Sequence, residues 1–330
     1  MDFRPLGKSG FLVSPVCLGT MTFGSPVGKE DAIKLTHGAI DLGINFIDTA
    51  NVYEGYDRFL GSSGGIAEEI LGDALANRRD QVILATKAGA PNGSGPQFAG
   101  LSATTILREL ERSLQRLKTD YIDLYIIHWP DGDTPLEATL NAMETAQRQG
   151  KIRAFGASNH YAYDLCELLW IADKRNWPRV ASSQIPYSML KREFHNDLYF
   201  CEKHGIGVTP YQYLQGGLLT GKYKRNQDAP AGSRLLENPN WIPKPDEKIF
   251  DQLEATAMLA DEAGLPFVQY TTAWTLAQPA MSSLILGVKT LDQIKDAIAG
   301  ASVTLAPWIL EKQDAITPPP PQHKAPFTRT

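Results

Sequence analysis

Short apolar runs alternate with longer segments of helical periodicity along most of this chain. From Val16 onward the alternation repeats about eight times, and turn-forming residues separate many of the units. Apolar runs joined by helical segments are typical of right-handed crossovers between neighbouring parallel strands. The pattern therefore predicts an α/β protein built on a parallel sheet.

Each predicted strand is an apolar run, and each predicted helix has apolar residues that recur every three or four positions. We expect strands at 16–19, 46–48, 82–86, 122–127 and 152–156, one from Val180, and two more at 207–208 and 283–286. We expect helices at 29–42, 66–75, 102–117, 136–148, 162–174, 197–204, 248–263 and 268–276, and one from Leu291. The clearest is 102–117, where Ser102 is a good N-cap and an apolar stripe is formed by Ile106, Leu110, Leu114 and Leu117.

Three segments lie outside this repeat. Residues 2–13 predict a hairpin with its turn at 7–10. A stretch rich in Gly, Pro and Asn at about 212–246 predicts a long functional or mobile loop. The tail, about 315–330, contains four consecutive prolines at 318–321 and is expected to be irregular.

The repeat can close as a barrel or remain open as a doubly wound sheet. No GxGxxG motif follows the first strand, and the candidate site residues end many strands instead of clustering at one switch point. We therefore expect a (β/α)₈ TIM barrel with an N-terminal β-hairpin and long loops at its C-terminal face. Barrels of this kind often exceed about 200 residues in one domain, so a single domain over 1–330 is expected.

Polar residues end three successive apolar runs. These residues are Asp48, Lys87 and His128, and Tyr53 follows Asp48 by five positions. If the three strands lie side by side at about 4.8 Å per strand, the outer two are about 10 Å apart. Their end residues can therefore converge on one small molecule.

This set of side chains suits the protonation of an oxygen that gains negative charge. An ammonium next to a phenol favours the phenolate, so Lys87 would lower the pKa of Tyr53. Asp48 would pair with Lys87 and keep it charged, and His128 would donate a hydrogen bond to a substrate carbonyl. Together they fit hydride delivery to a carbonyl. The alternative is a structural Asp48–Lys87 ion pair, with Tyr53 in a loop and His128 stacked on Trp129.

Composition narrows the classes of partner. The chain has 330 residues, of which 43% are hydrophobic and 21% charged, as in a globular protein with a large core. A net charge of −5 and a pI of about 5.7 give no attraction to nucleic acid or anionic lipid, so neither partner is expected. No apolar run approaches about 18 residues and residues 1–10 lack a signal-peptide core, which favours a cytoplasmic location.

The cysteines suggest neither a disulfide framework nor a metal site. Cys17, Cys166 and Cys201 are odd in number and have no paired or CxxC spacing. We expect all three to be buried as small apolar residues, and we expect no metal.

Five ordered motifs resemble the aldo/keto reductase family over nearly the whole chain, and in particular its bacterial and channel-β-subunit-like branch. They are Leu18-Gly19-Thr20-Met21, Phe46-Ile47-Asp48-Thr49-Ala50 with Tyr53, Ala85-Thr86-Lys87, Asp120-Tyr121-Ile122-Asp123-Leu124-Tyr125 ending in His128, and the run from Gly150 to Asn159. The resemblance implies that Tyr53 is the general acid, that Lys87 and Asp48 tune it, and that His128 orients the carbonyl.

The same resemblance implies NADPH as cofactor, with NADH less favoured. Ser158, Asn159 and Gln184 match positions that bind the nicotinamide carboxamide, and Tyr211 matches the aromatic residue that stacks on its ring. A helix cap for Ser158 or Asn159, and a core position for Tyr211, are the alternatives.

The phosphate end of the expected cofactor site lies in the long loop and at the last helix. Lys222 and Arg234 match phosphate contacts, and the start of the last helix favours an anion. Lys289 suits a 2′-phosphate, although it could also be a solvated surface lysine. The full expected cofactor set is Gly19, Thr20, Met21, Asp48, Ser158, Asn159, Gln184, Tyr211, Gln212, Leu214, Gly216, Lys222, Arg234, Gly287, Lys289, Gln293 and Asp296.

Some positions depart from the family pattern. Gln212 and Tyr213 stand where the family usually has Ser-Pro, and Ala297 stands where an Asn commonly contacts adenine. The insert at 54–65 is longer and more polar than the family's usual link. Its residues Asp57, Arg58 and Phe59 either shape the substrate pocket or form a solvated loop tip. We expect Phe23, Tyr56, Trp129 and aromatic residues of the long loops to line an apolar pocket.

The sequence thus predicts an NADPH-dependent reductase that converts an aldehyde or ketone to an alcohol, acting as a monomer or homo-oligomer on a small-molecule carbonyl substrate. Two alternatives remain. One is a nucleotide-binding regulatory subunit like the channel β subunits that share the barrel, with little turnover. The other is a barrel lyase that uses Lys87 as a Schiff base, which the Ser158, Asn159 and Gln184 set argues against.

Overall fold

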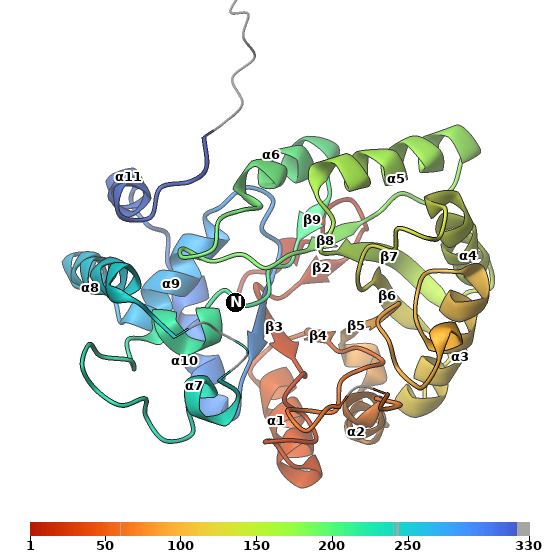
Figure 1. The fold of residues 1–330 in the computed structure, drawn as a ribbon, viewed down its shortest axis with the longest axis horizontal. Coiled ribbons are helices and arrows are strands. Elements are labelled where there is room, and N and C mark those ends of the chain that lie inside the picture. Colours follow the sequence, from red (N-terminus) through yellow and green to blue (C-terminus); the bar gives the residue numbers. More distant parts are fainter. Residues whose placement is uncertain (60, 240, 242–243, 322–330) are drawn as a thin grey trace, which may run out of the picture.

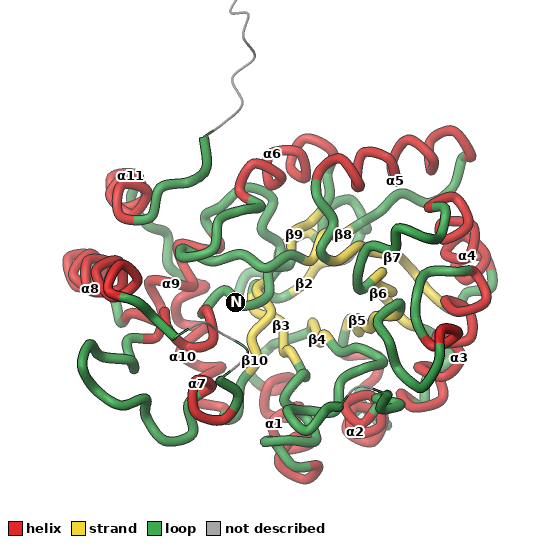
Figure 2. The backbone as a smooth tube through the Cα atoms, in the orientation of Figure 1, coloured by secondary structure: helices red, strands yellow, loops and turns green. Residues whose placement is uncertain are grey.

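The computed structural model describes residues 1–59, 61–239, 241 and 244–321. Among these residues, eight parallel strands form one sheet that curls into a ring, and helices cover its outer side (Figure 1). The tube view shows the same ring of strands within a shell of helices (Figure 2). No helix in the described ranges is both long and apolar enough to cross a membrane.

The strands alternate with helices in the predicted order. The parallel strands are β3 (Val16–Gly19), β4 (Phe46–Asp48), β5 (Ile83–Ala88), β6 (Ile122–Ile127), β7 (Ile152–Ser158), β8 (Ser182–Gln184), β9 (Gly207–Val208) and β10 (Leu284–Gly287). The helices are α1 (Lys29–Asp41), α2 (Ile66–Ala74), α3 (Ala103–Leu117), α4 (Leu136–Arg148), α5 (Ala162–Arg175), α6 (His195–His204), α7 (Arg234–Glu237), α8 (Glu247–Glu262), α9 (Phe267–Leu276), α10 (Leu291–Ala301) and α11 (Pro307–Ile316).

The ring of strands is closed by backbone hydrogen bonds. The sheet order is β10-β3-β4-β5-β6-β7-β8-β9, so β9 and β10 are its two ends. The Val208 amide donates to the Ala280 carbonyl at 2.8 Å, and the Ser282 amide donates to the Val208 carbonyl at 2.9 Å. A further bond joins Ile285 to Pro210 at 2.9 Å. These contacts bring the two ends together, which confirms the predicted (β/α)₈ barrel over the open sheet.

The N-terminal hairpin covers one end of the barrel. Its strands β1 (Arg4–Pro5) and β2 (Leu12–Val13) pair antiparallel, as predicted. Leu6 and Val13 are fully buried and pack with Cys17 and Phe46 from the interior of the barrel. The Lys8 amide donates to the carbonyl of Gly205, which lies just before β9, so the hairpin covers the amino ends of the strands. The carboxyl ends remain for the loops, as is usual for active sites in this architecture.

The strand register explains why the polar residues converge. Strands β4, β5 and β6 are neighbours, as predicted. Asp48 pairs with Ala85, and Lys87 pairs with Ile126 one residue before the end of β6. Because parallel neighbours end at the same edge, Asp48, Lys87 and the residue that follows β6 share one rim.

The structure differs from the sequence prediction at several elements. Strand β8 starts two residues after Val180, and α6 begins at His195 instead of residue 197. The predicted loop at 212–246 contains the 3₁₀ helix η3 (Gln215–Thr220) and the single-turn helix α7. Cys17 and Cys201 are buried as predicted, but Cys166 is exposed, because it lies on the outward face of α5.

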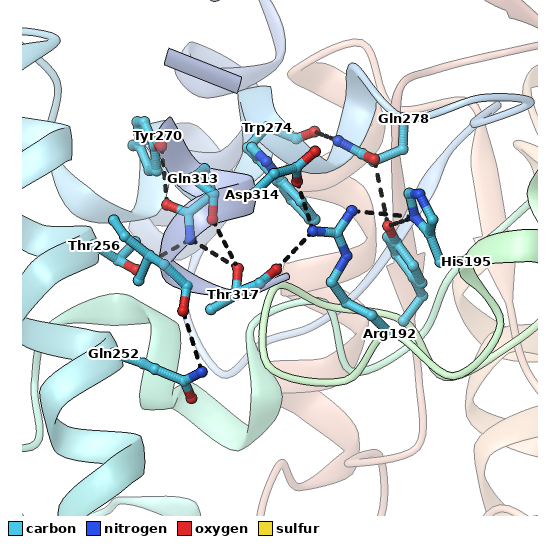
Figure 3. Close-up of polar contacts among 12 residues, drawn as sticks. Arg192, His195, Gln252, Thr256, Tyr270, Trp274, Gln278, Gln313, Asp314 and Thr317 are labelled. Atoms are coloured by element: carbon cyan, nitrogen blue, oxygen red, sulfur yellow. Dashed lines mark hydrogen bonds and ion pairs between the residues drawn. The ribbon is translucent and has the colours of Figure 1, made fainter. Parts of the chain in front are cut away.

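Helix α11 was not predicted, and it extends to Ile316 within the segment expected to be irregular. Figure 3 shows Arg192, from the loop between β8 and α6, with Asp314 of α11 on one side and His195 on the other. The guanidinium donates to Asp314 at 2.6 Å, to the Thr317 carbonyl at 2.8 Å and to His195 Nδ1 at 3.2 Å. Tertiary contacts of this kind support a short helix whose own sequence signal is weak.

Candidate active site

A large cleft opens at the carboxyl ends of the strands. Its volume is about 1060 Å³, at the upper end of the range for small-molecule and cofactor sites. Apart from Lys87, every predicted catalytic and cofactor-binding residue lines it. These residues are Gly19, Thr20, Met21, Asp48, Tyr53, His128, Ser158, Asn159, Gln184, Tyr211, Gln212, Leu214, Gly216, Lys222, Arg234, Gly287, Lys289, Gln293 and Asp296.

Lys87 lies behind Tyr53 and is fully buried. Its ammonium donates to Asp48 Oδ1 at 2.6 Å, to the Thr49 carbonyl at 2.8 Å and to the Tyr53 hydroxyl at 3.1 Å. These three contacts use all three N–H donors of the ammonium. Gln184 donates to the second Asp48 oxygen at 2.9 Å, so the carboxylate is held from both sides. Three of the four predicted catalytic side chains, Asp48, Lys87 and Tyr53, are therefore in direct contact, and Lys87 is directed at its partners instead of the open cleft.

The electrostatics of this group favour a charged lysine and a protonated tyrosine. Burial lowers the pKa of Lys87, but the Asp48 charge and the Tyr53 contact outweigh it, and the pKa is raised. Burial raises the pKa of Tyr53 above its ordinary value, and the nearby Lys87 charge offsets this only in part. Sequence reasoning considered the Lys87 charge alone and so predicted a lowered pKa for Tyr53. The phenol instead keeps its proton, as a proton donor must.

His128 sits at the edge of the Tyr53 ring, immediately after β6. The two ring centroids are 5.9 Å apart with the planes 79° to each other, and Trp129 stacks on the imidazole at 6.2 Å. Burial, and then the charges of Lys87 and Arg58, hold the pKa of His128 well below 6.5. The imidazole is thus neutral near pH 7, and its Nδ1 makes no hydrogen bond to the described residues.

The ends of β7 and β8 supply the amide groups of the site. Asn159 has a left-handed φ of 64° and donates to the His128 carbonyl at 2.9 Å. Its Oδ1 accepts a bond from the Tyr211 hydroxyl at 2.7 Å. The backbone amide of Asn159 in turn donates to the backbone carbonyl of Gln184 at 2.9 Å. These hydrogen bonds fix Ser158, Asn159, Gln184 and Tyr211 on one wall of the cleft. This arrangement differs from the alternatives, in which Ser158 or Asn159 caps a helix and Tyr211 is a core residue.

Three cations gather at the far end of the cleft. Lys289 pairs with Glu237 and donates to the Gly232 carbonyl at 2.9 Å. Arg234 lies over the ring of Tyr56 at 4.4 Å. Burial, then the charges of Lys289 and Arg234, lower the pKa of Lys222, which indicates that the three positive charges are close to one another.

The start of α10 already has polar partners. Thr290 caps the helix, and Gln293 Oε1 accepts a bond from the Lys289 amide at 2.8 Å. Gln293 therefore accepts from backbone N–H groups that the sequence analysis expected to bind an anion. The turn before Lys222 favours glycine, because Gly217 has a left-handed φ of 96° that other residues adopt only with strain.

The cleft includes residues that sequence reasoning missed. Lys191 and Asn238 line it, and they come from loops whose path no sequence signal gives. Trp241, an aromatic residue of the long loop, also lines it, as expected. Of the residues expected to line an apolar pocket, Tyr56 and Trp129 do so, but Phe23 is fully buried in the core.

The insert at 54–65 contributes to the cleft. Arg58 and Phe59 line it, as one of the two interpretations predicted, whereas Asp57 does not. Arg58 donates to the Val52 carbonyl at 2.7 Å and also to the Pro91 carbonyl. Residue 60 of this insert lies outside the described residues.

Comparisons with known proteins agree with this architecture. The sequence profile described as "Aldo/keto reductase family" matches residues 15–316. The chain is 36% identical to the uncharacterized oxidoreductase YrpG of Bacillus subtilis, with 97% of each chain covered. It is 33% identical to the protein tas of Escherichia coli, covering 96% of this chain and 97% of the relative. It is also 32% identical to a probable voltage-gated potassium channel subunit beta of Arabidopsis thaliana, covering 96% of each.

The family match spans every strand of the barrel sheet, from β3 to β10, and the loops that form the cleft. The relatives match over nearly their whole length, so the similarity is not confined to one motif. On these grounds the chain belongs to the aldo/keto reductase family of oxidoreductases.

Proposed function

We propose that this protein reduces an aldehyde or ketone to an alcohol with NADPH, and that Tyr53 protonates the carbonyl oxygen. The observation that carries the proposal is the contact of the Tyr53 hydroxyl, 3.1 Å from a Lys87 ammonium that Asp48 holds at 2.6 Å. A half-buried phenol that keeps its proton and faces a large cleft is suited to act as a general acid.

Each residue of this group has a separate part in the proposed reaction. Tyr53 gives its proton to the oxygen as negative charge develops there. The adjacent Lys87 ammonium stabilises the phenolate that remains, and Asp48 keeps the ammonium in place. His128, which is neutral, donates a hydrogen bond to the substrate oxygen and so aims it at Tyr53.

The residues of the cleft fit a dinucleotide phosphate. When bound, NADPH supplies the hydride. Ser158, Asn159 and Gln184 offer amide and hydroxyl groups for the carboxamide, and Tyr211 offers a ring face. At the other end, Lys222 and Lys289 offer positive charge for phosphate groups. Arg234 Nη1 is buried and makes no hydrogen bond to the described residues, which is the state expected of a donor kept for an anion.

A second candidate is a nucleotide-binding regulatory subunit with little turnover. The specific observation in its favour is that relatives at about a third identity have names that describe them as channel β subunits. Such a subunit would bind the nucleotide in the same cleft but would not reduce added carbonyl compounds.

The test that separates the two is the transfer of label. The protein is incubated with NADPH that carries deuterium at the transferable position and with a panel of small aldehydes and ketones. We expect deuterium at the carbinol carbon of the product, detected by mass spectrometry. Tight NADPH binding with no labelled alcohol from any member of the panel would favour the regulatory subunit.

A further inference from the structure

A buried carboxylate lies behind the active site on α3, outside the group described above. Glu109 has 1% of its side chain exposed. Burying a carboxylate is costly unless hydrogen bonds and charges compensate it. Its four bonding partners therefore indicate what this side chain does.

Glu109 is fully bonded, and its two oxygens face two different groups. Oε2 accepts bonds from the side-chain amides of Asn51, at 3.1 Å, and Asn92. Oε1 accepts bonds from Arg108 at 3.0 Å and Arg112 at 3.1 Å. Burial alone would raise the pKa of Glu109, but the bonds from Asn92, Arg108 and Asn51 outweigh it, and the pKa is lowered. The group is thus a permanent carboxylate near neutral pH.

The two amides come from the two loops that build the catalytic group. Asn51 lies two residues before Tyr53, and its backbone amide donates to the Lys87 carbonyl at 3.1 Å. Asn92 lies five residues after Lys87, in the loop between β5 and α3. Glu109 therefore ties the segment that carries the phenol to the segment that continues from the ammonium.

Arg58 joins the same two loops from the side of the cleft. It donates to the carbonyl of Val52, next to Asn51, and to the carbonyl of Pro91, next to Asn92. The two loops are thus bridged at adjacent positions, by the acceptor Glu109 on the side of α3 and by the donor Arg58 on the side of the cleft. Such double bridging restricts how far the Tyr53 loop can move relative to Lys87.

We infer that Glu109 is a positioning residue for Tyr53, which sets the distance between the phenol and the Lys87 ammonium through Asn51 and Asn92. The inference rests on the proposed function, because it concerns the general acid of that reaction. A carboxylate suits the task, since it is an acceptor at every lone pair and can take bonds from two amides and two guanidinium groups at once. Misplacement of a reacting group by about 1 Å can reduce turnover on the order of 100-fold.

Three variants of α3 separate positioning from folding. Glu109→Ala removes the bridge. Glu109→Gln keeps one carbonyl oxygen for Asn51 and Asn92 and turns its NH₂ towards the arginines, which are 29% and 41% exposed and can rotate into solvent. Glu111→Ala is the matched control, because it removes a carboxylate from the same helix that is 49% exposed and pairs with Lys151 at the surface.

The measurements are kcat, KM, the NADPH dissociation constant and the solvent deuterium isotope effect on kcat. For Glu109→Ala we expect kcat to fall on the order of 10- to 100-fold with little change in KM or nucleotide affinity. The solvent isotope effect should increase, because proton transfer from a displaced Tyr53 limits turnover. Glu109→Gln should recover most of kcat, and Glu111→Ala should match wild type.

An unchanged kcat and isotope effect in a folded Glu109→Ala variant would overturn the inference. It would also be overturned if kcat and NADPH affinity fell together, since that indicates general disruption of the cleft. If Glu109→Ala does not fold, Asn92→Ala breaks one bond of the same bridge while the carboxylate stays, and it must show the same isotope effect. Failure of the proposed function is a separate result, because wild type itself would then not reduce any carbonyl.

Discussion

The two ends of the cleft are built in different ways. At the end that holds the proposed general acid, called below the catalytic end, Asp48 and Lys87 lie on neighbouring strands. Their charges are paired inside the protein, with 2% and 0% of the side chains exposed. At the far end, Lys289 and Glu237 come from the last βα turn and the long loop, and their ion pair is about 30% exposed. The first pair is out of water, whereas the second is in contact with it.

The exposure of each ion pair decides which charges are fixed and which can be exchanged for those of a ligand. A buried pair is preorganised, and removing one partner leaves an uncompensated charge. A partly exposed pair contributes little and is screened by salt, so a ligand anion can replace the carboxylate at small cost. We expect the catalytic end to be rigid before any ligand binds and the far end to rearrange around a phosphate.

The largest expected effect comes from breaking the buried pair. Lys87→Met leaves Asp48 buried without its counter-charge, so the free energy of unfolding should fall by about 3–5 kcal/mol. The double variant Lys87→Met/Asp48→Asn removes both charges, and it should recover most of that stability while turnover remains lost. Urea unfolding and steady-state kinetics of the three proteins measure the two effects separately.

Two outcomes would contradict this view of the buried pair. If Lys87→Met is as stable as wild type, the Asp48 charge does not depend on Lys87 for its stabilisation. If the double variant recovers turnover together with stability, the role of Lys87 is structural alone, as the alternative interpretation of the sequence supposed.

The next effect concerns the far end of the cleft. Lys289→Met removes a cation suited to a 2′-phosphate, and a bond to a charged group is worth about 1.5–3 kcal/mol. NADPH affinity should therefore fall on the order of 10- to 100-fold. NADH affinity, which involves no 2′-phosphate, should stay the same. Titration of both nucleotides by fluorescence quenching measures the change.

A matched variant tests whether the exposed pair exchanges. Glu237→Gln frees Lys289 from its carboxylate, so NADPH should bind a few-fold more tightly, as expected for an exposed ion pair worth about 0.2–1 kcal/mol. An equal loss of NADPH and NADH affinity in Lys289→Met would contradict the assignment of this lysine to the 2′-phosphate.

The smallest expected effect is on stability and concerns His195, which lies away from both ends of the cleft. It tests the consequence of burying a titratable group without affecting catalysis. Burial, and then the Arg192 charge, lower the pKa of His195 to about 4, compared with about 6.5 for an unfolded chain. The unfolded state therefore binds a proton that the folded state excludes, and stability is lost as the pH falls below about 6.5. Between pH 7.5 and 5.5 we expect this histidine to account for about 1 kcal/mol of lost unfolding free energy, a value reduced for solvent screening.

His195→Asn tests this value, because its side-chain oxygen can take the place of Nδ1 beside Tyr187 and Arg192. The variant should lose less stability than wild type over the same pH range. His204→Gln, on the same helix, is the control and should keep the wild-type slope. Equal slopes in His195→Asn and wild type would show that His195 is not the group that titrates.

The fold and the convergence of Asp48, Lys87 and His128 on one rim could be predicted because they follow from local periodicity. Apolar runs that end in Asp48, Lys87 and His128 become neighbouring strands, and parallel strands end at one edge, so the residues had to meet. The direction of the Tyr53 pKa could not be predicted in the same way. It depends on how deeply the phenol is buried, and a sequence does not give burial directly.

The remaining features depend on contacts between distant segments. Lys289 and Glu237 are 52 positions apart, and the loop that carries Glu237 has no periodicity that fixes its path. Glu109 resembles an ordinary surface charge beside the apolar stripe of its helix. Helix α11 is held in part by the bond from Arg192 to Asp314, which are 122 positions apart.

The most direct test of Tyr53 as the proton donor compares wild type with Tyr53→Phe, in which only the phenolic hydroxyl is lost. NADPH binding and the rate of carbonyl reduction are measured on the same preparations. We expect the NADPH dissociation constant to be unchanged and kcat to fall by about 10²- to 10⁴-fold, the usual contribution of a general acid. Reduction at the wild-type rate by Tyr53→Phe would contradict the central claim that Tyr53 supplies the proton.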